Sequence, residues 1–323
     1  MIIVTGACGF IGSNIIKFLN EEGVDEIIAV DNLENGKKFR NIADLDIVDY
    51  LDKDALLVEL SKENFCKRIE SIIHMGACSK TTEWNGKYMM SNNYEYSKEL
   101  VKVATKLDIQ FIYASSASVY GNGKKGFIEK KECEGAINVY AYSKLLFDDY
   151  IRRNYSETNS KIVGLRFFNV YGPNESHKSG MASVIYHFHK QLSETNILKL
   201  FEGSDGYKDG DQKRDFIHVK DCSKVVKWFL DNSDKSGVFN VGTGQANSFN
   251  LVAKLIIDYQ VPKFSNYLDH LEYIPFPNEL VNSYQSFTQA DLNKLRKIGY
   301  ENKFIDIKEG IESYLKYLSN SNH

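Results

Sequence analysis

The chain has 323 residues, of which 43% are hydrophobic and 26% charged, with only 4 prolines. That composition is typical of a globular protein with a large core, and it excludes a disordered or fibrous chain. A formal net charge of -3 gives no electrostatic reason to expect binding to nucleic acid or to an anionic membrane surface. No apolar run approaches the roughly 18 residues that span a bilayer.

The cysteines and histidines give no indication of a metal site. Five cysteines stand at positions 8, 66, 78, 133 and 222, and no two have the Cys-x-x-Cys spacing of a metal or redox motif. His187 and His189 are two residues apart, so they point to different sides of a helix. We therefore expect no bound metal and a reducing compartment. Because residues 2–4 look like a strand and no basic leader precedes them, we expect the protein to be cytoplasmic.

Short β-branched runs alternate with helical patterns in the first half of the chain. The runs lie at residues 2–4, 27–30, 72–74, 111–113 and 162–165. Each run is typical of a fully buried strand in a parallel sheet. Apolar residues at positions 15, 16 and 19 have helical spacing between the first two runs. The chain is therefore expected to begin with a strand, a tight turn, a helix and a parallel strand.

The pattern changes after about residue 170. Residues 171–174 form a predicted turn, and residues 202–215 are rich in glycine and charge and lack periodicity, which predicts a mobile surface loop. Strand-like runs return at 216–219 and 238–241. Apolar residues spaced along 307–315 predict a final amphipathic helix.

Three glycines mark the turn between the first strand and the first helix. Gly6, Gly9 and Gly12 allow a tight turn and a close approach of the backbone to a pyrophosphate. The amino terminus of the helix adds unpaired N–H groups and a partial positive charge. Asp31 ends the second strand, where an acidic residue commonly binds a ribose. Together these features predict a dinucleotide site in a Rossmann-type, doubly wound parallel sheet.

This α/β fold is expected to have two parts. Residues 1–170 would form the cofactor-binding Rossmann domain, to which segments around 216–245 return. Residues 171–323 would form mainly a smaller, mixed α/β substrate-binding domain.

Cations near Asp31 bear on the choice of cofactor. An acidic residue at this position favours NAD. Lys37, Lys38 and Arg40 follow closely, and Lys53 follows the next strand-like segment, so they could offset the charge of a 2′-phosphate. We therefore favour NADP, with NAD as the alternative.

A serine, a tyrosine and a lysine form the predicted catalytic group. Ser116 follows the strand at 111–113, and the four-residue spacing of Tyr140 and Lys144 places them on one face of a helix. A phenol is a weak base at neutral pH, but a neighbouring cation lowers its pKa. Lys144 and the positive ring of an oxidised nicotinamide are expected to do this for Tyr140. Ser116 would then hydrogen-bond the substrate oxygen as its proton leaves.

Through the glycine turn, the Ser116 segment and Tyr140-x-x-x-Lys144, the chain resembles the extended short-chain dehydrogenase/reductase family of nucleotide-sugar enzymes. Further segments are similar to the ADP-glyceromanno-heptose 6-epimerases: 82–90, 166–173, 181–184, 273–277 and 287–292. The resemblance implies a tightly bound NADP in each subunit and assembly into a homo-oligomer, a pentamer. It also implies the reaction, which is the interconversion of ADP-D-glycero- and ADP-L-glycero-D-manno-heptose in lipopolysaccharide core synthesis. It implies transient oxidation at C6″, with Tyr140 and Lys178 as the two acid/base groups and Ser116 and Lys144 assisting.

The resemblance also assigns binding residues, position by position. The implied cofactor contacts are Gly6, Gly9, Phe10, Ile11, Gly12, Asp31, Asn32, Lys38, Lys53, Met75, Gly76, Ala77, Cys78, Ser79, Asn92, Lys144, Val170 and Lys178. The implied substrate contacts are Ser116, Asn169, Gly180, His187, Phe201, Glu202, Gly203, Ser204, Arg214 and Tyr284. Arg214 is suited to a diphosphate because a planar guanidinium can bind it through two hydrogen bonds.

Two departures from the family pattern concern the substrate. The loop 205–212 is longer than usual, so the alignment of Arg214 rests on the residues that follow it. The order Ser179-Gly180 is reversed relative to the family.

A 4,6-dehydratase would need a pair of acidic residues at the positions of Ala117 and Ser118. A UDP-hexose 4-epimerase, or another nucleotide-sugar epimerase or reductase, is the main enzymatic alternative. A non-catalytic protein that senses NAD(P) is the alternative from another class, although the presence of Ser116, Tyr140 and Lys144 together argues against it.

Overall fold

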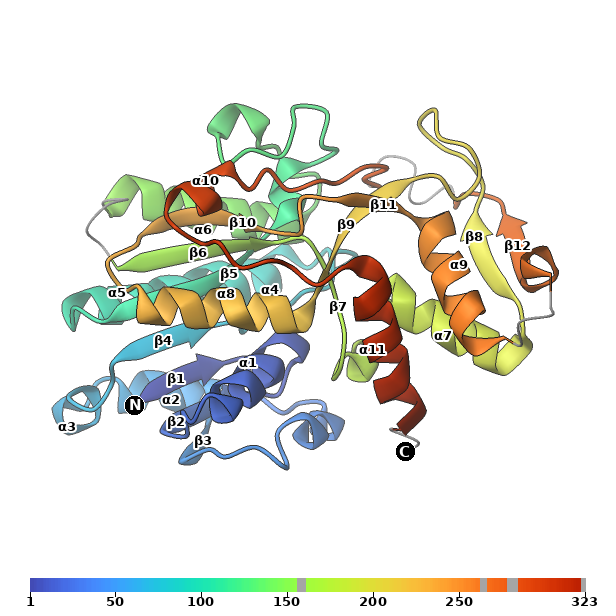
Figure 1. Cartoon of the computed structure of the whole chain (residues 1–323). Coiled ribbons are helices and arrows are strands. Elements are labelled where there is room, and N and C mark those ends of the chain that lie inside the picture. The colour runs from blue at the N-terminus through green and yellow to red at the C-terminus, as the bar shows by residue number, and fades with distance from the viewer. Residues whose placement is uncertain (156–160, 262–265, 278–283, 321–323) are drawn as a thin grey trace.

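The computed structural model describes residues 1–155, 161–261, 266–277 and 284–320. Within these ranges, seven strands form one parallel sheet, and two smaller sheets lie in a second lobe (Figure 1). The order across the main sheet is β10 (Gly237–Val241), β6 (Ile162–Phe167), β5 (Gln110–Ser116), β4 (Ser71–His74), β1 (Ile2–Thr5), β2 (Ile27–Asp31) and β3 (Asp49–Asp52). The predicted Rossmann-type parallel sheet is therefore confirmed.

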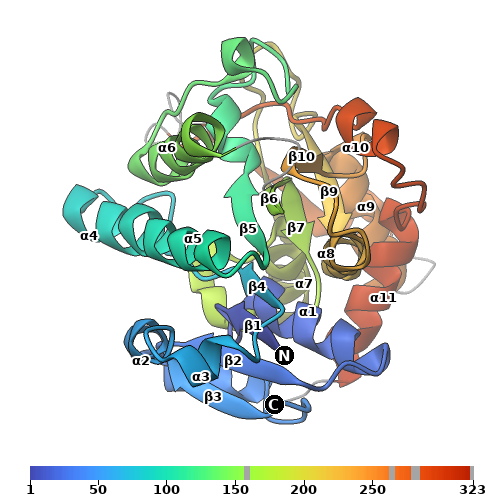
Figure 2. The same ribbon diagram turned by 90° about the vertical axis from the view of Figure 1, so that its left-hand side faces the viewer.

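Helices cover both faces of the main sheet, which explains why most of its strands are buried along their whole length (Figure 2). One face carries α1 (Phe10–Glu21), α8 (Val219–Asp231) and α10 (Asn293–Lys297). The opposite face carries α2 (Lys53–Glu59), α3 (Glu63–Cys66), α5 (Tyr96–Lys106) and α6 (Val139–Asn154), and α4 (Gly86–Met90) packs beside α6. Apolar side chains from both the strands and the helices fill each interface, as expected for a doubly wound sheet.

One glycine in the sheet makes room for a buried tyrosine. Gly164 of β6 lies opposite Tyr113 of β5, and a Cβ at Gly164 would be 2.5 Å from the Tyr113 hydroxyl oxygen. Any larger residue would therefore displace Tyr113, which packs edge-on against Phe147 of α6 with ring centroids 4.8 Å apart. The pair joins the middle of the sheet to α6.

The second lobe is built from later parts of the chain. Its sheets contain β7 (Asn169–Tyr171), β9 (Lys213–His218) and β11 (Ala246–Ser248), and separately β8 (Leu198–Phe201) and β12 (Leu271–Ile274). Helices α7 (Val184–Thr195), α9 (Phe249–Gln260) and α11 (Ile307–Asn320) form a shared apolar core with these strands. The predicted final helix is thus present as α11.

The strands predicted at 216–219 and 238–241 lie in different sheets. β10 is an edge strand of the main sheet, whereas β9 pairs with β7 and β11. The prediction of a surface loop over the whole of 202–215 was wrong at its end. Gln212, Arg214 and Asp215 are buried, and β9 already begins at Lys213. Polar side chains concealed this strand because their hydrogen-bond partners come from distant segments, such as Thr243 for Asp215.

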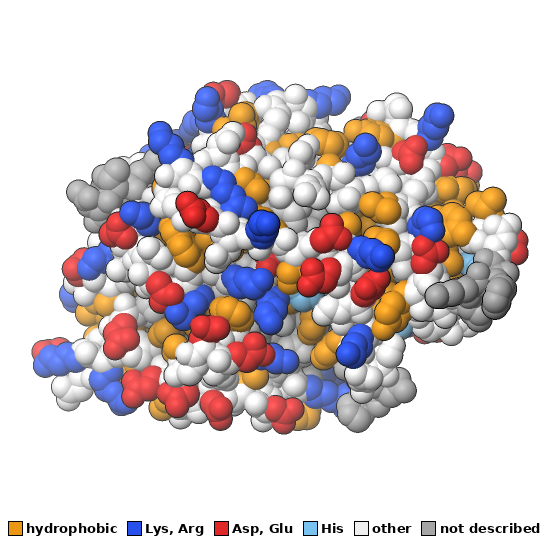
Figure 3. Space-filling model, viewed as in Figure 1, with side chains coloured by type: hydrophobic (Ala, Val, Ile, Leu, Met, Phe, Trp, Pro, Cys, Tyr) orange, Lys and Arg blue, Asp and Glu red, His pale blue; other side chains and the backbone are white. Residues whose placement is uncertain are grey.

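Within the described ranges, every helix is too short or too polar to cross a lipid bilayer. Acidic and basic side chains are intermixed over the face of the molecule shown in Figure 3, without a large area of one sign.

Candidate active site

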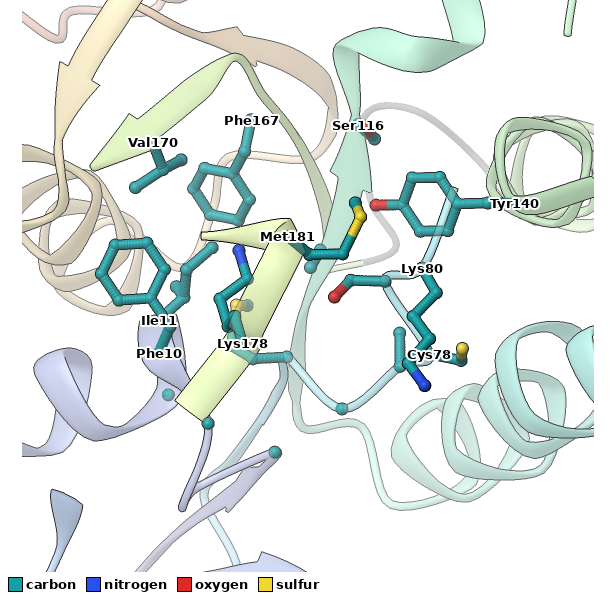
Figure 4. A pocket seen from close by; sticks show the side chains of 18 of the residues that line it. Phe10, Ile11, Cys78, Lys80, Ser116, Tyr140, Phe167, Val170, Lys178 and Met181 are labelled. Carbon is teal, nitrogen blue, oxygen red and sulfur yellow. The ribbon is translucent and has the colours of Figure 1, made fainter. Parts of the chain in front are cut away.

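A cavity of about 950 Å³ lies at the carboxyl ends of β1, β4 and β5, where ligands bind in doubly wound sheets. Residues from the start of α1, from the loop after β4 and from the end of β5 form its walls. Residues 177–179 and 181–184, which lead into α7 of the second lobe, line it from another side. Both lobes therefore contribute to the cavity, and Figure 4 shows side chains from both around it.

The glycine-rich turn forms one wall of the cavity. No side chain caps the start of α1, and its first turn has no acidic residue, so the N–H groups there are left for another partner. The turn is closely packed, because a Cβ at Gly12 would lie 2.2 Å from the carbonyl oxygen of Gly6. Gly6 itself has a φ of +66°, and a Cβ there would lie 2.7 Å from the Gly76 nitrogen. These residues fit a pyrophosphate group held at a helix N-terminus.

The end of β2 carries a buried ion pair. Asp31 accepts hydrogen bonds from the Cys8 and Asn32 backbone nitrogens at 3.0 and 2.8 Å, and Lys38 Nζ lies 2.5 Å from its Oδ1. Lys53 also lines the cavity and donates to Asn92 Oδ1 at 3.0 Å. Two of the four predicted cations, Lys38 and Lys53, therefore line the cavity. Lys37 and Arg40 are exposed and lie outside its lining.

Ser116 stands at the end of β5 and is oriented by Ser118. The Ser118 backbone nitrogen and hydroxyl donate to Ser116 Oγ at 3.2 and 2.8 Å. A hydroxyl oxygen has two acceptor lone pairs, so both are used and the Ser116 proton is left to be donated. Burial raises the pKa of the Tyr140 phenol, and the hydrogen bond with Ser116 lowers it. Ser116 is thus the group that favours the phenolate in the protein itself.

Lys144 lies in the cavity wall, and its amine is held by the neighbouring strand β5. It shares a face of α6 with Tyr140, and its Nζ donates to the Ala114 carbonyl oxygen at 2.7 Å. Burial lowers the pKa of Lys144 to about 8, and the nearby Asp148 carboxylate opposes this decrease. The role of Lys144 in lowering the pKa of Tyr140, together with the positive ring of an oxidised nicotinamide, stays a prediction. The structure places Lys144 in the wall of the same cavity as Tyr140, with its amine held by β5.

Lys178 lies across the cavity from Tyr140, beside the start of α1 (Figure 4). Its Nζ is 5.2 Å from the centre of the Phe10 ring. Burial lowers the pKa of Lys178, and the carboxylate of Glu175 raises it. A half-buried lysine of lowered pKa, such as Lys178, can exchange a proton near neutral pH more readily than an exposed lysine.

Glu175 holds the short loop that carries Lys178. It is fully buried and accepts hydrogen bonds from the Ser183 backbone nitrogen, from the Ser183 hydroxyl at 2.7 Å and from the Gly172 nitrogen at 3.3 Å. Asn41 joins the same loop to the glycine-rich turn by donating to the carbonyl oxygen of Cys8 at 2.9 Å, with the His177 Nδ1 atom 3.2 Å away. The loop is therefore fixed to both lobes.

The structure places all the cofactor residues implied by the resemblance in the wall of this cavity, together with Ser116, Tyr140 and Asn169. The other implied substrate residues lie outside that wall: Gly180, His187, Phe201, Glu202, Gly203, Ser204, Arg214 and Tyr284. Arg214 is connected to it, because its guanidinium carbon lies 5.5 Å from the ring centre of Phe249, a cavity residue, and 4.5 Å from that of Tyr284. Tyr284 in turn packs against Phe276, and Phe276 against Phe201.

Several cavity residues were not predicted from the sequence. Thr5, Tyr88, His177, Phe216 and Phe249 all line it. The position of Thr5 at the end of the first strand could have indicated this, and His177 adjoins Lys178 in the chain. Phe216 and Phe249 have no motif around them, and they reach the cavity only because the second lobe folds against the first.

A comparison with families of known proteins identifies the chain. The model of the NAD dependent epimerase/dehydratase family matches residues 2–242. The chain belongs to this family. Its members include nucleotide-sugar epimerases and dehydratases, so the chain is an enzyme of that class with a nicotinamide dinucleotide as its cofactor.

Solved structures of the family are similar over almost the whole chain. The ADP-L-glycero-D-manno-heptose-6-epimerase of Helicobacter pylori is 27% identical, covers 98% of this chain and 96% of its own, and has a TM-score of 0.79. The UDP-glucose 4-epimerase of Thermotoga maritima is 25% identical, with coverages of 100% and 99% and a TM-score of 0.79. The UDP-glucose 4-epimerase of Thermus thermophilus, solved in complex with NAD, is 23% identical, with 99% coverage of each chain and a TM-score of 0.78.

Proposed function

We propose that this enzyme is an ADP-glyceromanno-heptose 6-epimerase that uses NADP and supplies a sugar precursor of the lipopolysaccharide inner core. The observation that carries the proposal is the presence of two proton-transfer groups, Tyr140 and Lys178, on different sides of one cavity. An epimerase that oxidises a carbinol and reduces it on the opposite face needs a proton acceptor and a proton donor for two orientations of the same oxygen. One group on each side meets this need.

Each residue of the candidate active site has a separate role in this reaction. A bound nicotinamide dinucleotide would supply the acceptor and donor of hydride. The start of α1 would hold its pyrophosphate, and Lys144 and Tyr140 would line the part of the cavity where the chemistry takes place. Tyr140 takes the proton of the C6″ hydroxyl. As Tyr140 becomes protonated, Ser116, oriented by Ser118, turns its one O–H from Tyr140 to the substrate oxygen and donates a hydrogen bond to it. After the keto group reorients, Lys178 gives a proton to the oxygen from the other side of the cavity. The reverse reaction exchanges the two roles.

The buried cation Arg214 supports a substrate with a diphosphate. Within the described ranges, Arg214 forms no ion pair with a carboxylate, and burial lowers its pKa. A buried guanidinium without a carboxylate partner is costly unless another anion joins it. A diphosphate fits this role, since guanidinium groups bind phosphate oxygens through two parallel hydrogen bonds. The ADP-heptose identity itself rests on the similar segments in the sequence and on the Helicobacter pylori relative.

The charges around Asp31 support NADP. Lys38 and two backbone nitrogens already neutralise the Asp31 carboxylate, so it repels a 2′-phosphate less than a free carboxylate would. Lys53 adds a second cation in the cavity wall. The proposal also includes assembly into a homo-oligomer, a pentamer by resemblance.

A comparison of substrates tests the proposal. The purified enzyme is incubated separately with ADP-D-glycero-β-D-manno-heptose, UDP-glucose and UDP-N-acetylglucosamine, and the products are separated by chromatography. We expect kcat/KM for the ADP-heptose to exceed that for either UDP-sugar by at least about a hundredfold. Faster conversion of a UDP-hexose would instead support a UDP-hexose 4-epimerase, the candidate that the Thermotoga maritima relative favours.

A further inference from the structure

A buried carboxylate, Asp148, lies one helical turn beyond Lys144 on α6. It is fully buried and does not line the cavity, so it does not touch a ligand there. With Tyr140 and Lys144 it forms a series of four-residue steps along one face of the helix. Its side-chain hydrogen bonds go to Tyr113 and Ser115 of β5 and to Arg166 of β6.

Asp148 holds β5 on both sides of the residue that Lys144 contacts. The Tyr113 hydroxyl donates to Asp148 Oδ1 at 2.9 Å, and the Ser115 hydroxyl donates to Oδ2 at 2.9 Å. Ala114, between these two residues, accepts the hydrogen bond from Lys144 Nζ at 2.7 Å. Side chains two residues apart on a strand point to the same face, so Tyr113 and Ser115 both reach α6. Because Ser116 directly follows Ser115 in β5, these hydrogen bonds also fix the position of Ser116.

Arg166 of β6 keeps the carboxylate in place. Its Nε and Nη2 atoms donate to Asp148 Oδ2 at 3.0 and 2.8 Å. Its Nη1 donates to the Tyr120 hydroxyl at 2.9 Å, and its Nη2 also forms an ion pair with Glu134. A buried carboxylate with an arginine partner and two hydroxyl donors has its charge compensated, which makes its geometry well defined.

We propose that Asp148 is a positioning residue for the catalytic group. By joining β5 to α6 around Ala114, it sets the separation of Ser116 from Tyr140 and holds the Lys144 ammonium against β5. This inference rests on the proposed roles of Ser116, Tyr140 and Lys144, but not on the identity of the sugar. It explains why a fully buried charge stands immediately behind the cavity wall.

The same arrangement affects the charge of Lys144. The titratable groups around its amine are Asp148, Cys78 from the loop after β4 and the buried His74 of β4. Burial favours the neutral amine, and Asp148 opposes this. Removal of the Asp148 charge should therefore lower the pKa of Lys144 below its value of about 8.

Two mild variants and one strong variant test the proposal. Ser115→Ala and Tyr113→Phe each remove one hydrogen bond but leave the pair of Asp148 with Arg166. For each we expect a loss in kcat on the order of fivefold, with KM and cofactor affinity unchanged. Asp148→Asn should lose on the order of a hundredfold in kcat, and the basic limb of its kcat profile should move to lower pH.

Ser223→Ala is the matched control. Ser223 is a buried serine on α8 whose hydroxyl donates to the Val219 carbonyl at 3.2 Å, outside the cavity wall. It should lose a similar amount of thermal stability to Ser115→Ala while retaining kcat. Equal kcat values in Ser115→Ala, Tyr113→Phe and Ser223→Ala would overturn the proposal, even if Asp148→Asn failed to fold.

A second readout needs no sugar. In protein labelled with [6-¹³C]lysine, the Lys144 resonance is assigned by its loss in Lys144→Arg and is titrated in the wild type and in Asp148→Asn. A lower pKa of Lys144 in Asp148→Asn supports the proposal, and an unchanged pKa contradicts it. If the wild type converts no ADP-heptose, the proposed substrate is wrong, but the role of Asp148 can still be tested. Ser115→Ala and Tyr113→Phe can then be compared on the sugar that the enzyme does convert, and the titration of Lys144 needs no sugar.

Discussion

Acidification from pH 7 to pH 4.5 is expected to reduce the free energy of unfolding by about 2.5 kcal/mol through one residue, His74. His74 is buried at the end of β4, with Thr5 Oγ1 at 2.6 Å from its Nδ1 and Ser97 Oγ at 2.8 Å from its Nε2. The Gly76 nitrogen donates to Thr5 Oγ1, and Ser97 donates to the Asn93 carbonyl. This chain of donors and acceptors is complete when the histidine is neutral and carries its proton on Nε2.

The magnitude follows from the two pKa values. Burial lowers the pKa of His74 from 6.5 to about 3, and the positive charge of Lys144 adds to this effect. At pH 4.5, proton binding stabilises the unfolded state by about 2.7 kcal/mol and the folded state hardly at all, whereas at pH 7 the difference is about 0.2 kcal/mol. The contribution of neutral His74 to the free energy of unfolding is thus present above pH 6.5 and is lost as the pH falls toward 3.

Urea unfolding at pH 7 and pH 4.5 measures this effect. The change in unfolding free energy between the two pH values is compared for the wild type, His74→Gln and His187→Gln, where His187 is a half-buried histidine of α7. We expect the change to be smaller by about 2.5 kcal/mol in His74→Gln and unaltered in His187→Gln. An identical change in wild type and His74→Gln would show that protonation of His74 does not destabilise the folded protein.

Three further predictions concern the cavity. Tyr140→Phe should lose at least about a hundredfold in kcat while circular dichroism and bound cofactor stay unchanged, and an undiminished rate would remove Tyr140 from the mechanism. Gly12→Ala should abolish cofactor retention, because its Cβ would lie 2.2 Å from the Gly6 carbonyl oxygen. Retention is measured by absorbance after gel filtration. The control Gly36→Ala should retain the cofactor, because a Cβ there would meet no other part of the described chain within 4 Å. Arg214→Met should raise KM for the nucleotide sugar by about tenfold or more with little change in kcat, and an unchanged KM would argue against a diphosphate at Arg214.

The main sheet could be predicted because its strands are buried on both faces. Such strands are continuous apolar runs, and the runs at 2–4, 27–30, 72–74, 111–113 and 162–165 all became strands of that sheet. The strand β3 was recognised only as a strand-like segment before Lys53, without bounds, because it lies at the edge of the sheet, where Asp49 and Asp52 are exposed. The strand β9 was partly missed because its buried polar residues are satisfied by partners far away in the sequence.

The candidate site was predictable where a short motif fixes both backbone and chemistry. The glycine turn, Ser116 and Tyr140 all come to one cavity, as the order of the strands requires. The direction of the Lys144 amine was not predictable, because helical spacing fixes a face but not the partner that a long side chain reaches. The place of Arg214 among aromatic rings likewise depends on the packing of the second lobe.

The central claim is an internal transfer of hydride at C6″ of an ADP-heptose. Proton NMR of ADP-D-glycero-β-D-manno-heptose mixed with purified enzyme in D₂O, without added nicotinamide, tests it most directly. We expect the two epimers to equilibrate and the C6″ position to keep its proton, because the hydride never exchanges with solvent. Absence of conversion even after NADP⁺ is added, or incorporation of solvent deuterium at C6″, would contradict it.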